Sequence, residues 1–587
     1  MYSGTRLIEL LERQHQARQQ ADLFKKGIFA IQWRAKVGSF PHPDVETIVS
    51  AGEPCGAFRP GSGCPQKLSR PEEKRNLGQN LNYFPDLPLN GYIPGSAIRG
   101  LVRSWAKERP DIKPRMLQLL GYQDDDKIQS GKIEFLDAWP KEATRLTLDI
   151  VNPQQEFQVY HEGQGTPLSF YTLGDGEKPI PVTVAIRGIP GKTTAAEVAE
   201  VWDWVRQAVS LYGVGSRTAS GYGAIKIKAK KSEKNQDAPK IILDPGYSRK
   251  EFNFILYGQG SYGADNQPKS LPELRPTHWR GWLRSWVLRF LLGVMSKENA
   301  EITLAELMGV LEPESRKGCL RLEMIKGSTW GESSEDSPRF YGWKGKLVLT
   351  APKDTLNEII LPIVKFAVMV GGVGRGWRRP LHIFRTDNGY EAARGTDLTL
   401  THQVKDKNSD RMKAVKFGLG VKPERWQQAY DQWQEAVRKK WSYRMAIGQN
   451  DRQSWEIFSP NTCAVYIVPG PDANPISKQE IEWLETYPED TRGDGVNLIY
   501  QPTHPQNYKR NPEMGGNAGS GSASCSWASI KRVNIPNTEE QTDCQEVVCL
   551  FLGGKNPIAD HVRSRFLKDL GNMRGGVHLF GVPAVGQ

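Results

Sequence analysis

The phrase RGLVRSW at residues 99–105 recurs as RGWLRSW at residues 280–286, so the two copies share the pattern R-G-x-x-R-S-W. A second phrase follows each copy, as GVGSR at residues 213–217 and as GVGR at residues 372–375. An ordered pair of motifs that occurs twice in one chain is typical of a duplicated domain. The repeat therefore predicts two copies of one domain in tandem.

Each R-G-x-x-R-S-W phrase is predicted to lie on a helix. In the first copy, one helical face collects the apolar residues and is expected to face the core. These residues are Ile98, Leu101, Val102 and Trp105. Arg99 and Arg103 share another face, as do Arg280 and Arg284, and each pair either contacts phosphates or braces the fold. Gly100 is expected to allow close approach of a neighbouring backbone.

Apolar periodicity around the motifs predicts the same order of elements in both copies. In the first copy, the other elements are strands at 27–35, 132–139, 145–151 and 179–187, a helix at 194–211 and a strand at 224–229. In the second, they are strands at 252–257 and 347–350, a helix at 356–370 and a strand at 381–384. This β-α-β-β-α-β order predicts an α+β protein with two tandem ferredoxin-like domains.

The charged, apolar-poor stretch KKSEKNQDAPK at residues 230–240 suits a linker. We therefore predict a first domain at 1–232, a linker at 233–248 and a second domain at 249–587. The second domain is expected to carry an insertion near 388–526 and a long, elaborated C-terminal region. Within that insertion, residues 423–441 have the periodicity of an amphipathic helix.

The composition favours a polyanionic partner. The 587 residues carry a formal net charge of +12, which suits nucleic acid, although solubility alone could account for it. No apolar run approaches the roughly 20 residues that span a bilayer, and the N-terminus lacks a secretory segment, so we expect a cytoplasmic protein without membrane contact. Seven scattered cysteines without a C-x-x-C pair predict no metal site and no cofactor.

The two glycine-rich loops are the strongest candidates for binding. Backbone N–H groups that are not screened by side chains can cradle phosphates, and arginines beside aromatic rings can hold single-stranded RNA. The first loop offers Gly213, Gly215, Ser216, Arg217, Gly221, Tyr222 and Gly223, with Tyr222 expected to stack on a base or sugar. The second offers Gly372, Gly374, Arg375, Trp377, Arg378 and Arg379. The alternative is a tight turn beside a solvated basic patch.

No catalytic signature is present. A Walker loop requires G-x-x-x-x-G-K-[ST] before a helix, whereas these glycines follow one. His42, Asp44, Asp149 and His161 could in principle take part in RNA cleavage, but none of them belongs to a supporting cluster of residues. The sequence therefore predicts a protein that is not an enzyme, with an RNA endonuclease using His42 or Asp44 as the alternative. An enzyme unrelated to RNA is a third possibility.

These motifs resemble those of the RAMP superfamily of CRISPR-associated proteins. In the first part, the resemblance rests on YIPGS at 92–96, IRG at 98–100, Arg103, FLDAWP at 135–140, LDIVNP at 148–153 and the loop at 213–223. In the second part, it rests on LRP at 274–276, WRG at 279–281, Arg284 and GGVGR at 371–375. The first part is similar to the sixth subunit of the type III-B Cmr effector complex, and the second to its first subunit. Most of residues 1–385 thus resembles a fusion of two Cmr subunits.

The resemblance implies RRM-type, ferredoxin-like folds that bind guide RNA (crRNA) near its 3′ end together with the paired target RNA. It implies a non-catalytic structural subunit of a ribonucleoprotein that acts in antiviral defence with other type III CRISPR effector subunits. Arg99 and Arg280 are included among the expected RNA contacts. The second loop departs from the family pattern, because Trp377 and RRP at 378–380 stand where a further Gly-aromatic-Gly is expected. The alternative within the family is a RAMP-type endoribonuclease that cleaves guide precursor or target RNA.

Overall fold

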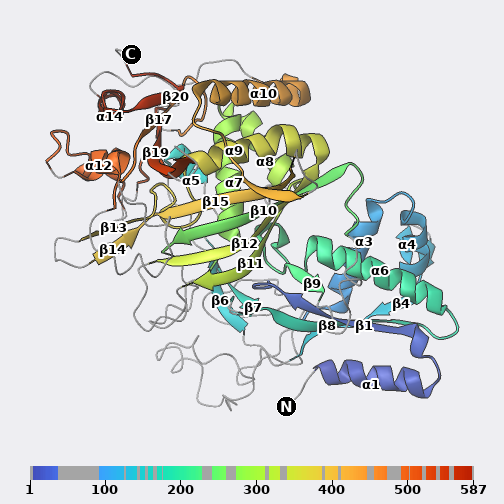
Figure 1. Ribbon diagram of the computed structural model, residues 1–587. Coiled ribbons are helices and arrows are strands. Elements are labelled where there is room, and N and C mark those ends of the chain that lie inside the picture. Colours follow the sequence, from blue (N-terminus) through green and yellow to red (C-terminus); the bar gives the residue numbers. More distant parts are fainter. Residues whose placement is uncertain are drawn as a thin grey trace, which may run out of the picture. The chain divides into compact units, whose positions relative to one another are not determined.

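A computed structural model gives the fold, and its chain forms two compact units (Figure 1). The first comprises residues 1–151, 167–247 and 262–276, and the second comprises 152–166, 248–261 and 277–587. The structure describes residues 4–36, 92–124, 127–141, 146–151, 156–162, 168–174, 176, 178–227, 241–259, 273–310, 316–330, 340–385, 391–406, 411–445, 455–471, 491–501, 503–517, 524–536, 542–553 and 561–584. The domain boundaries drawn from the sequence stay predictions.

The first unit is built on an antiparallel sheet with the spatial order β4-β8-β1-β9. Its strands are β1 (Phe24–Ile31), β4 (Ile133–Phe135), β8 (Ile180–Gly188) and β9 (Ile225–Ile227), and β5 (Trp139–Pro140) also pairs with β8. The two helices that connect the strands are α3 (Gly95–Lys107) and α6 (Ala195–Tyr212). The chain therefore runs β1-α3-β4-β8-α6-β9, which is the β-α-β-β-α-β order that the sequence predicts.

Alternation along β8 separates the two faces of this sheet. Val182, Val184 and Ile186 join the core formed with α3 and α6, whereas Ala185 packs on the opposite face with Ile8 of α1. This division follows from the two-residue period of a strand. Figure 1 shows α1 (Gly4–Ala17) on the other side of the sheet from α3 and α6.

Smaller elements complete the first unit. The short 3₁₀ helix η1 (Ala21–Leu23) precedes β1, and α4 (Lys113–Leu120) follows α3. Two two-stranded sheets pair β2 (Tyr122–Asp124) with β3 (Lys127–Gln129), and β6 (Leu146–Val151) with β7 (Leu168–Leu173). The 3₁₀ helix η4 (Thr218–Ser220) lies inside the first glycine loop.

The second unit begins with a sheet of the same plan, in the spatial order β11-β12-β10-β15-β16. Its strands are β10 (Tyr247–Gly258), β11 (Arg321–Trp330), β12 (Tyr341–Pro352), β15 (Thr396–Lys405) and β16 (Met412–Lys416). Its helices are α7 (Pro276–Leu291), α8 (Lys297–Met308) and α9 (Leu361–Val370), the last preceded by a π-helical turn, η5 (Thr355–Ile360). Apart from α8, β16 and a hairpin between α9 and β15, the order β10-α7-β11-β12-α9-β15 repeats that of the first unit.

The final strand of this sheet is not the one predicted at residues 381–384. That segment forms β13 (His382–Arg385), which pairs with β14 (Glu391–Arg394) in a separate hairpin. The strand beside β10 is β15, whose Leu398 and Leu400 alternate into the core. The prediction took the first apolar run after the second glycine loop, at residues 381–384, as the strand of this sheet. The strand that pairs with β10 is instead the next alternating segment, β15.

The C-terminal part of the second unit contains a third sheet with the same plan. Its strands are β17 (Cys463–Pro469), β18 (Ala528–Pro536), β19 (Thr542–Phe551) and β20 (Val577–Gly581), in the spatial order β18-β19-β17-β20. Its helices are α12 (Asp494–Tyr500) and α14 (Val562–Gly571). The stretch predicted as an insertion thus supplies β17, an inner strand that pairs with both β19 and β20.

The remaining described helices of the second unit are α5 (Glu156–Tyr160), α10 (Pro423–Trp441), η6 (Ser442–Arg444), η8 (Tyr508–Arg510) and α13 (Pro512–Gly515). Helix α10 has the bounds predicted from its periodicity. Its buried stripe is Trp426, Tyr430, Trp433, Val437 and Trp441. Trp433 packs against Phe290 of α7 at 4.9 Å between ring centroids, so α10 contributes to the aromatic core. No helix in the described ranges is both long and apolar enough to cross a bilayer.

Candidate nucleic-acid interface

The arginines of the first R-G-x-x-R-S-W motif cap a neighbouring helix. The Arg99 guanidinium donates to the carbonyl of Leu120, and that of Arg103 donates to the carbonyl of Gly121. These carbonyls lie at the C-terminus of α4, where the last turn lacks intrahelical donors and favours positive charge. The pair thus braces the turn from α3 to α4.

The second copy of the motif makes the same contacts. Arg280 Nη2 donates to the carbonyl of Met308 at 2.7 Å, and Arg284 Nη1 donates to that of Gly309 at 3.1 Å, at the C-terminus of α8. Four arginines at matching places therefore act as helix caps. Arg99 and Arg280 thus each donate to a carbonyl of the protein itself, and their expected contact with RNA stays a prediction.

The other motif residues divide into core and surface. Trp105 and Trp286 are almost fully buried, as expected from their helical spacing. Gly100 is not the packing contact that the sequence suggested. It is exposed, and a Cβ atom on it would meet no atom within 4 Å.

The first glycine loop, residues 213–223, closes on itself after α6. Val214 donates its N–H to the carbonyl of Gly223 at 2.9 Å, and Gly213 and Gly223 both have positive φ. A Cβ atom on Gly213 would lie 2.7 Å from the carbonyl oxygen of Gly223. Only glycine fits this approach, so the loop's glycines serve first to close the turn.

The exposed end of the first loop carries Gly215, Ser216 and Arg217. Ser216 donates its N–H to the carbonyl of Lys36 at 2.9 Å, which brings two cationic side chains together. Burial lowers the pKa of Lys36, and the positive charge of Arg217 lowers it further. Arg217 is half-buried and has a left-handed backbone. Two neighbouring cations beside open glycine backbone favour an anionic ligand.

Tyr222 does not present a stacking surface. Its side chain is fully buried, and its hydroxyl donates to the carboxylate of Asp149. Burial raises the pKa of Tyr222, and the charge of Asp149 raises it further, so the hydroxyl stays protonated. Tyr222 thus belongs to the interior beneath the loop, and the prediction that its ring stacks on a base or sugar is wrong.

A buried ionic cluster underlies Tyr222. Asp149 accepts from Arg275 Nη2 at 2.6 Å, and Arg275 also lies 3.5 Å from Glu273. Glu273 accepts from the Arg34 guanidinium and, at 3.2 Å, from the indole N–H of Trp33. Two carboxylates and two guanidinium groups balance one another here, as buried charges require. Asp149, a candidate for catalysis, is thus engaged within the fold.

The second glycine loop, residues 371–379, exposes one arginine. Gly372 donates its N–H to the carbonyl of Trp377 at 2.9 Å, and Gly374 and Gly376 have positive φ. Arg375 lies between these two glycines and is exposed. Within the described ranges, it has no hydrogen-bond or ion-pair partner.

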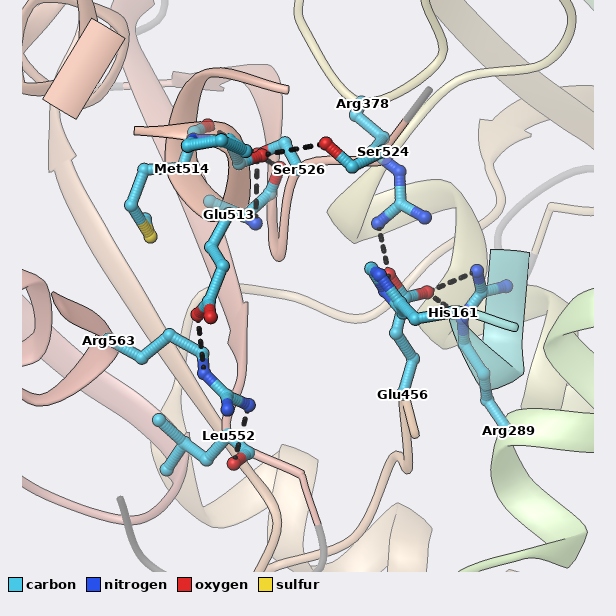
Figure 2. Close-up of polar contacts among 12 residues, drawn as sticks. His161, Arg289, Arg378, Glu456, Glu513, Met514, Ser524, Ser526, Leu552 and Arg563 are labelled. Atoms are coloured by element: carbon cyan, nitrogen blue, oxygen red, sulfur yellow. Dashed lines mark hydrogen bonds and ion pairs between the residues drawn. The ribbon is translucent and has the colours of Figure 1, made fainter. Parts of the chain in front are cut away.

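Arg378 is buried at the base of the same loop (Figure 2). Its guanidinium lies 2.7 Å from Glu456, which also accepts from Arg289 Nε at 2.9 Å and contacts His161 Nε2 at 2.9 Å. Burial alone would raise the pKa of Glu456, but the charges of Arg378 and Arg289 together hold it well below its usual range. Arg378 and His161 therefore belong to the interior of the second unit.

Arg379 and Trp377 also support the second loop. Arg379 is buried and donates to the carbonyls of Ala528 and Met514 at 2.6 and 2.9 Å. The Trp377 ring lies under the guanidinium groups of Arg378 and Arg289, at 4.5 and 5.2 Å from its centroid. Of the basic residues predicted in this loop, only Arg375 faces solvent.

A further stack extends from His161 and could not be recognised in the sequence. The His161 and Trp527 rings are parallel, with centroids 4.1 Å apart, and the Arg563 guanidinium lies 4.0 Å from the Trp527 ring. Arg563 in turn binds Glu513 at 3.0 Å and the Leu552 carbonyl at 2.9 Å, as Figure 2 shows. These residues come from five distant segments, so no local pattern marks them.

The motif segments that suggested a family are likewise structural. Gly95 donates its N–H to Asp137 Oδ1 at 2.8 Å, and Ile93 pairs with Ala138, so the YIPGS and FLDAWP segments meet at the start of α3. His42 and Asp44 lie outside the described residues. Among the residues that are described, no group of three or more His, Cys, Asp or Glu side chains is placed to hold a metal ion.

Residues 76–226 match the family model of the RAMP superfamily. This segment contains the first arginine pair and the first glycine loop. No curated protein sequence matches the chain.

Among solved structures, the chain is similar to part of a type III-B Cmr-beta complex bound to cognate target RNA. The identity is 14%, with 38% of this chain and 65% of that chain covered, and the TM-score is 0.24. It is also similar to Cmr6 from Pyrococcus furiosus, with 19% identity, 35% and 98% coverage and a TM-score of 0.19. A third is a CRISPR RNA-guided surveillance complex, with 12% identity, 32% and 57% coverage and a TM-score of 0.17.

The exposure of Gly100 leads to a stability prediction. Gly100→Ala should raise the free energy of unfolding by about 0.5–1 kcal/mol, because alanine restricts the unfolded chain and nothing obstructs its methyl group. Urea unfolding followed by tryptophan fluorescence measures this change. Gly95→Ala is the contrasting variant, since its Cβ would lie 2.1 Å from the Phe135 carbonyl oxygen, and it should destabilise. A destabilising Gly100→Ala would show that the backbone needs glycine there.

The buried carboxylate under the second loop leads to another prediction. Glu456→Gln should destabilise the protein by about 3–5 kcal/mol, because it leaves the buried Arg289 and Arg378 without a counter-charge. In the wild type, the lowered pKa of Glu456 contributes stability above the unfolded-state pKa, and this is lost as pH falls through the folded-state value. Urea unfolding at neutral and acid pH tests both statements. Glu435→Gln, in an exposed pair with Arg438, is the control and should change stability by less than about 0.5 kcal/mol.

Proposed function

We propose that this chain is a non-catalytic, RNA-binding structural subunit of a type III CRISPR ribonucleoprotein in the cytoplasm. It would hold the 3′ region of the guide RNA and the target RNA paired with it, together with other effector subunits. The observation that carries the proposal is the pair of glycine loops at matching places in two units of one plan. Each presents open backbone and an arginine at the surface, Arg217 in one and Arg375 in the other.

The fold supports the finer description as tandem ferredoxin-like domains. In the first unit, the first strand β1 lies between β8 and β9, and β4 lies at the edge beside β8. In the second unit, β10 lies in the same way between β12 and β15, and β11 lies at the edge beside β12. A β-α-β-β-α-β chain in this spatial order is the ferredoxin-like arrangement. Together with the motif resemblance, it supports a fusion of the sixth and first Cmr subunits as the origin of the two units.

The charge distribution supports RNA as the ligand. A formal net charge of +12 raises the local concentration of a polyanion, and a surface guanidinium beside glycine N–H groups can bind a phosphate without reading the base. Arg375 is suited to this because no described protein group competes for its donors. Affinity should therefore depend on salt and little on sequence.

The partners of the described catalytic candidates support a non-catalytic role. Asp149 is held by Tyr222 and Arg275, and His161 is held between Glu456 and Trp527. A general base needs to reach the proton that it removes, and these side chains face other protein groups. Cutting of RNA would then be the task of another subunit.

The binding proposal predicts a loss of RNA affinity when the loop arginines are removed. Arg217→Ala and Arg375→Ala should each weaken binding of single-stranded RNA about three- to tenfold and lower the salt slope, because each removes one phosphate contact. Fluorescence anisotropy with labelled RNA, repeated over a salt series, measures both. Arg438→Ala removes an exposed arginine of α10 and is the matched control for charge. Equal affinity of a protein carrying both Arg217→Ala and Arg375→Ala and of the control would refute the proposal.

The non-catalytic assignment predicts that guide precursor and target RNA stay intact. Purified full-length protein incubated with each RNA, with and without Mg²⁺, should release no fragments on a denaturing gel. His42→Ala and Asp44→Ala are the informative variants. Cleavage by the wild type that either variant abolishes would contradict this assignment and favour an endoribonuclease.

A further inference from the structure

The edge strand β16 (Met412–Lys416) of the second unit is exposed along its whole length. At the opposite edge of the same sheet, β11 buries Leu322 and Met324. Residues 403–405 of β15, which pair with β16, are exposed as well. An antiparallel strand in a packed sheet usually has one face on the core. The two segments instead form a ribbon that contributes little to the core of the unit.

The outer edge of this ribbon carries backbone groups that are available for pairing. Phe417 donates its N–H to the carbonyl of Leu400 at 2.8 Å, and Asp406 donates its N–H to that of Arg411 at 2.9 Å. Hydrogen-bonded pairs alternate along an antiparallel ladder, so the odd-numbered residues of β16 direct their N–H and C=O groups at β15. The even-numbered residues direct theirs away from the sheet, and no group in the described ranges pairs with them. These residues are Met412, Ala414 and Lys416.

The ribbon is positively charged. Residues 401–406 and 411–416 contain four lysines and arginines against one acidic residue. Lys413 and Lys416 are exposed, and no acidic side chain in the described part of the chain forms an ion pair with either. The edge therefore favours a partner with negative charge.

The ribbon also exposes apolar side chains on both of its faces. Val404 and Val415 are 41% and 40% exposed and share one face, since their cross-strand partners are Lys413 and His402. Met412 lies on the other face and is 59% exposed. Apolar side chains grouped on one exposed element favour burial against a partner.

We propose that β16 is a docking edge for an extended acidic segment of another protein subunit, which pairs with it as an added strand. The inference rests on the proposed function, because it names a surface through which the chain joins another subunit of that ribonucleoprotein. A protein strand matches the alternating N–H and C=O groups of the edge and can cover the apolar side chains, which RNA cannot do in the same way. A second copy of β16 would set the same lysines against one another, which is how edge lysines prevent self-association.

The pairing of an added antiparallel strand determines which side chains it needs. Residues directly opposite each other share a face and are in contact. An acidic residue is favoured opposite Lys416 and Lys413, and an apolar residue opposite Val415, Ala414 and Met412. From its N-terminus, the complementary sequence is therefore glutamate-valine-valine-glutamate-valine.

The test uses the full-length protein and a fluorescently labelled peptide that carries this sequence. Fluorescence anisotropy should show binding that weakens as salt is added, because exposed charges are screened. A peptide with lysine in place of both glutamates should not bind. In the protein, exchange of both cations, by Lys413→Glu and Lys416→Glu, should weaken binding of the acidic peptide about tenfold. Lys439→Glu reverses an exposed charge on α10 and is the matched control, with unchanged binding.

A backbone variant tests the pairing itself. Ala414→Pro removes an N–H that points away from β15, so it should weaken peptide binding about three- to tenfold and leave the existing ladder in place. Ala414→Ser keeps this N–H and should bind as the wild type does. Thermal unfolding of each variant shows that the fold is retained. Hydrogen exchange followed by mass spectrometry should show added protection in residues 411–417 when the acidic peptide is bound.

The results separate this inference from the proposed function. If the acidic peptide binds no better than the lysine peptide while Arg217→Ala and Arg375→Ala still weaken RNA binding, the docking edge is refuted and the proposed function stands. If the acidic peptide binds as described but those two variants leave RNA affinity unchanged, the docking edge stands and RNA binding by the glycine loops is refuted.

Two other occupants of the edge would each overturn the inference. If Lys413→Glu with Lys416→Glu lowers RNA affinity and the acidic peptide does not bind, the ribbon is an RNA contact. If sedimentation shows a dimer that Ala414→Pro dissociates, and the peptide does not bind, the edge pairs with a second copy of the chain.

Discussion

Each glycine loop rests on a buried carboxylate that neutralises an arginine. Under the first loop, Asp149 holds the Tyr222 hydroxyl and pairs with Arg275, and under the second loop, Glu456 pairs with Arg378 and Arg289. An unpaired charge in these positions would cost several kcal/mol, so each cluster is stable only as a complete set. Tyr222 of the first loop and Arg378 of the second are themselves members of these clusters. The candidate RNA contacts thus depend on ionic pairs that never reach the surface.

The duplicated arginine pairs illustrate how a basic motif can serve the fold. Arg99 and Arg103 cap α4, and Arg280 and Arg284 cap α8, each through the carbonyls of a helix end. A guanidinium has several donors and a permanent charge, which suits a C-terminus with unsatisfied carbonyls. The repeated phrase therefore marks a repeated corner between two helices. The charge that we propose to bind RNA lies elsewhere, on Arg217 and Arg375 in the glycine loops.

Three sheets of the same plan organise the chain, and the sequence motifs mark only two of them. The third lacks the R-G-x-x-R-S-W phrase, and its short helix α12 offers little periodicity. Its loop of residues 572–576 contains the glycines and the arginine but not the valine of the other two phrases. This unit is recognised only from the pairing of β17 with both β19 and β20. The strands β17 and β20 are far apart in the sequence, although they are neighbours in the sheet. A sequence pattern over a few residues does not indicate such pairing.

The sequence by itself determined the elements, because periodicity and caps act over a few residues. Helix α10 has its predicted bounds, α6 (Ala195–Tyr212) lies within one residue of its predicted range of 194–211, and the mixed α+β class follows from the order of elements. Only the tertiary structure decided which arginines reach the surface. Arg375, Arg378 and Arg379 are nearly adjacent in sequence, yet the first is exposed while the other two are buried against Glu456 and the Ala528 carbonyl. The reason is physical: exposure of a charged side chain depends on whether a distant segment supplies a counter-charge or an acceptor, and no local pattern contains that information.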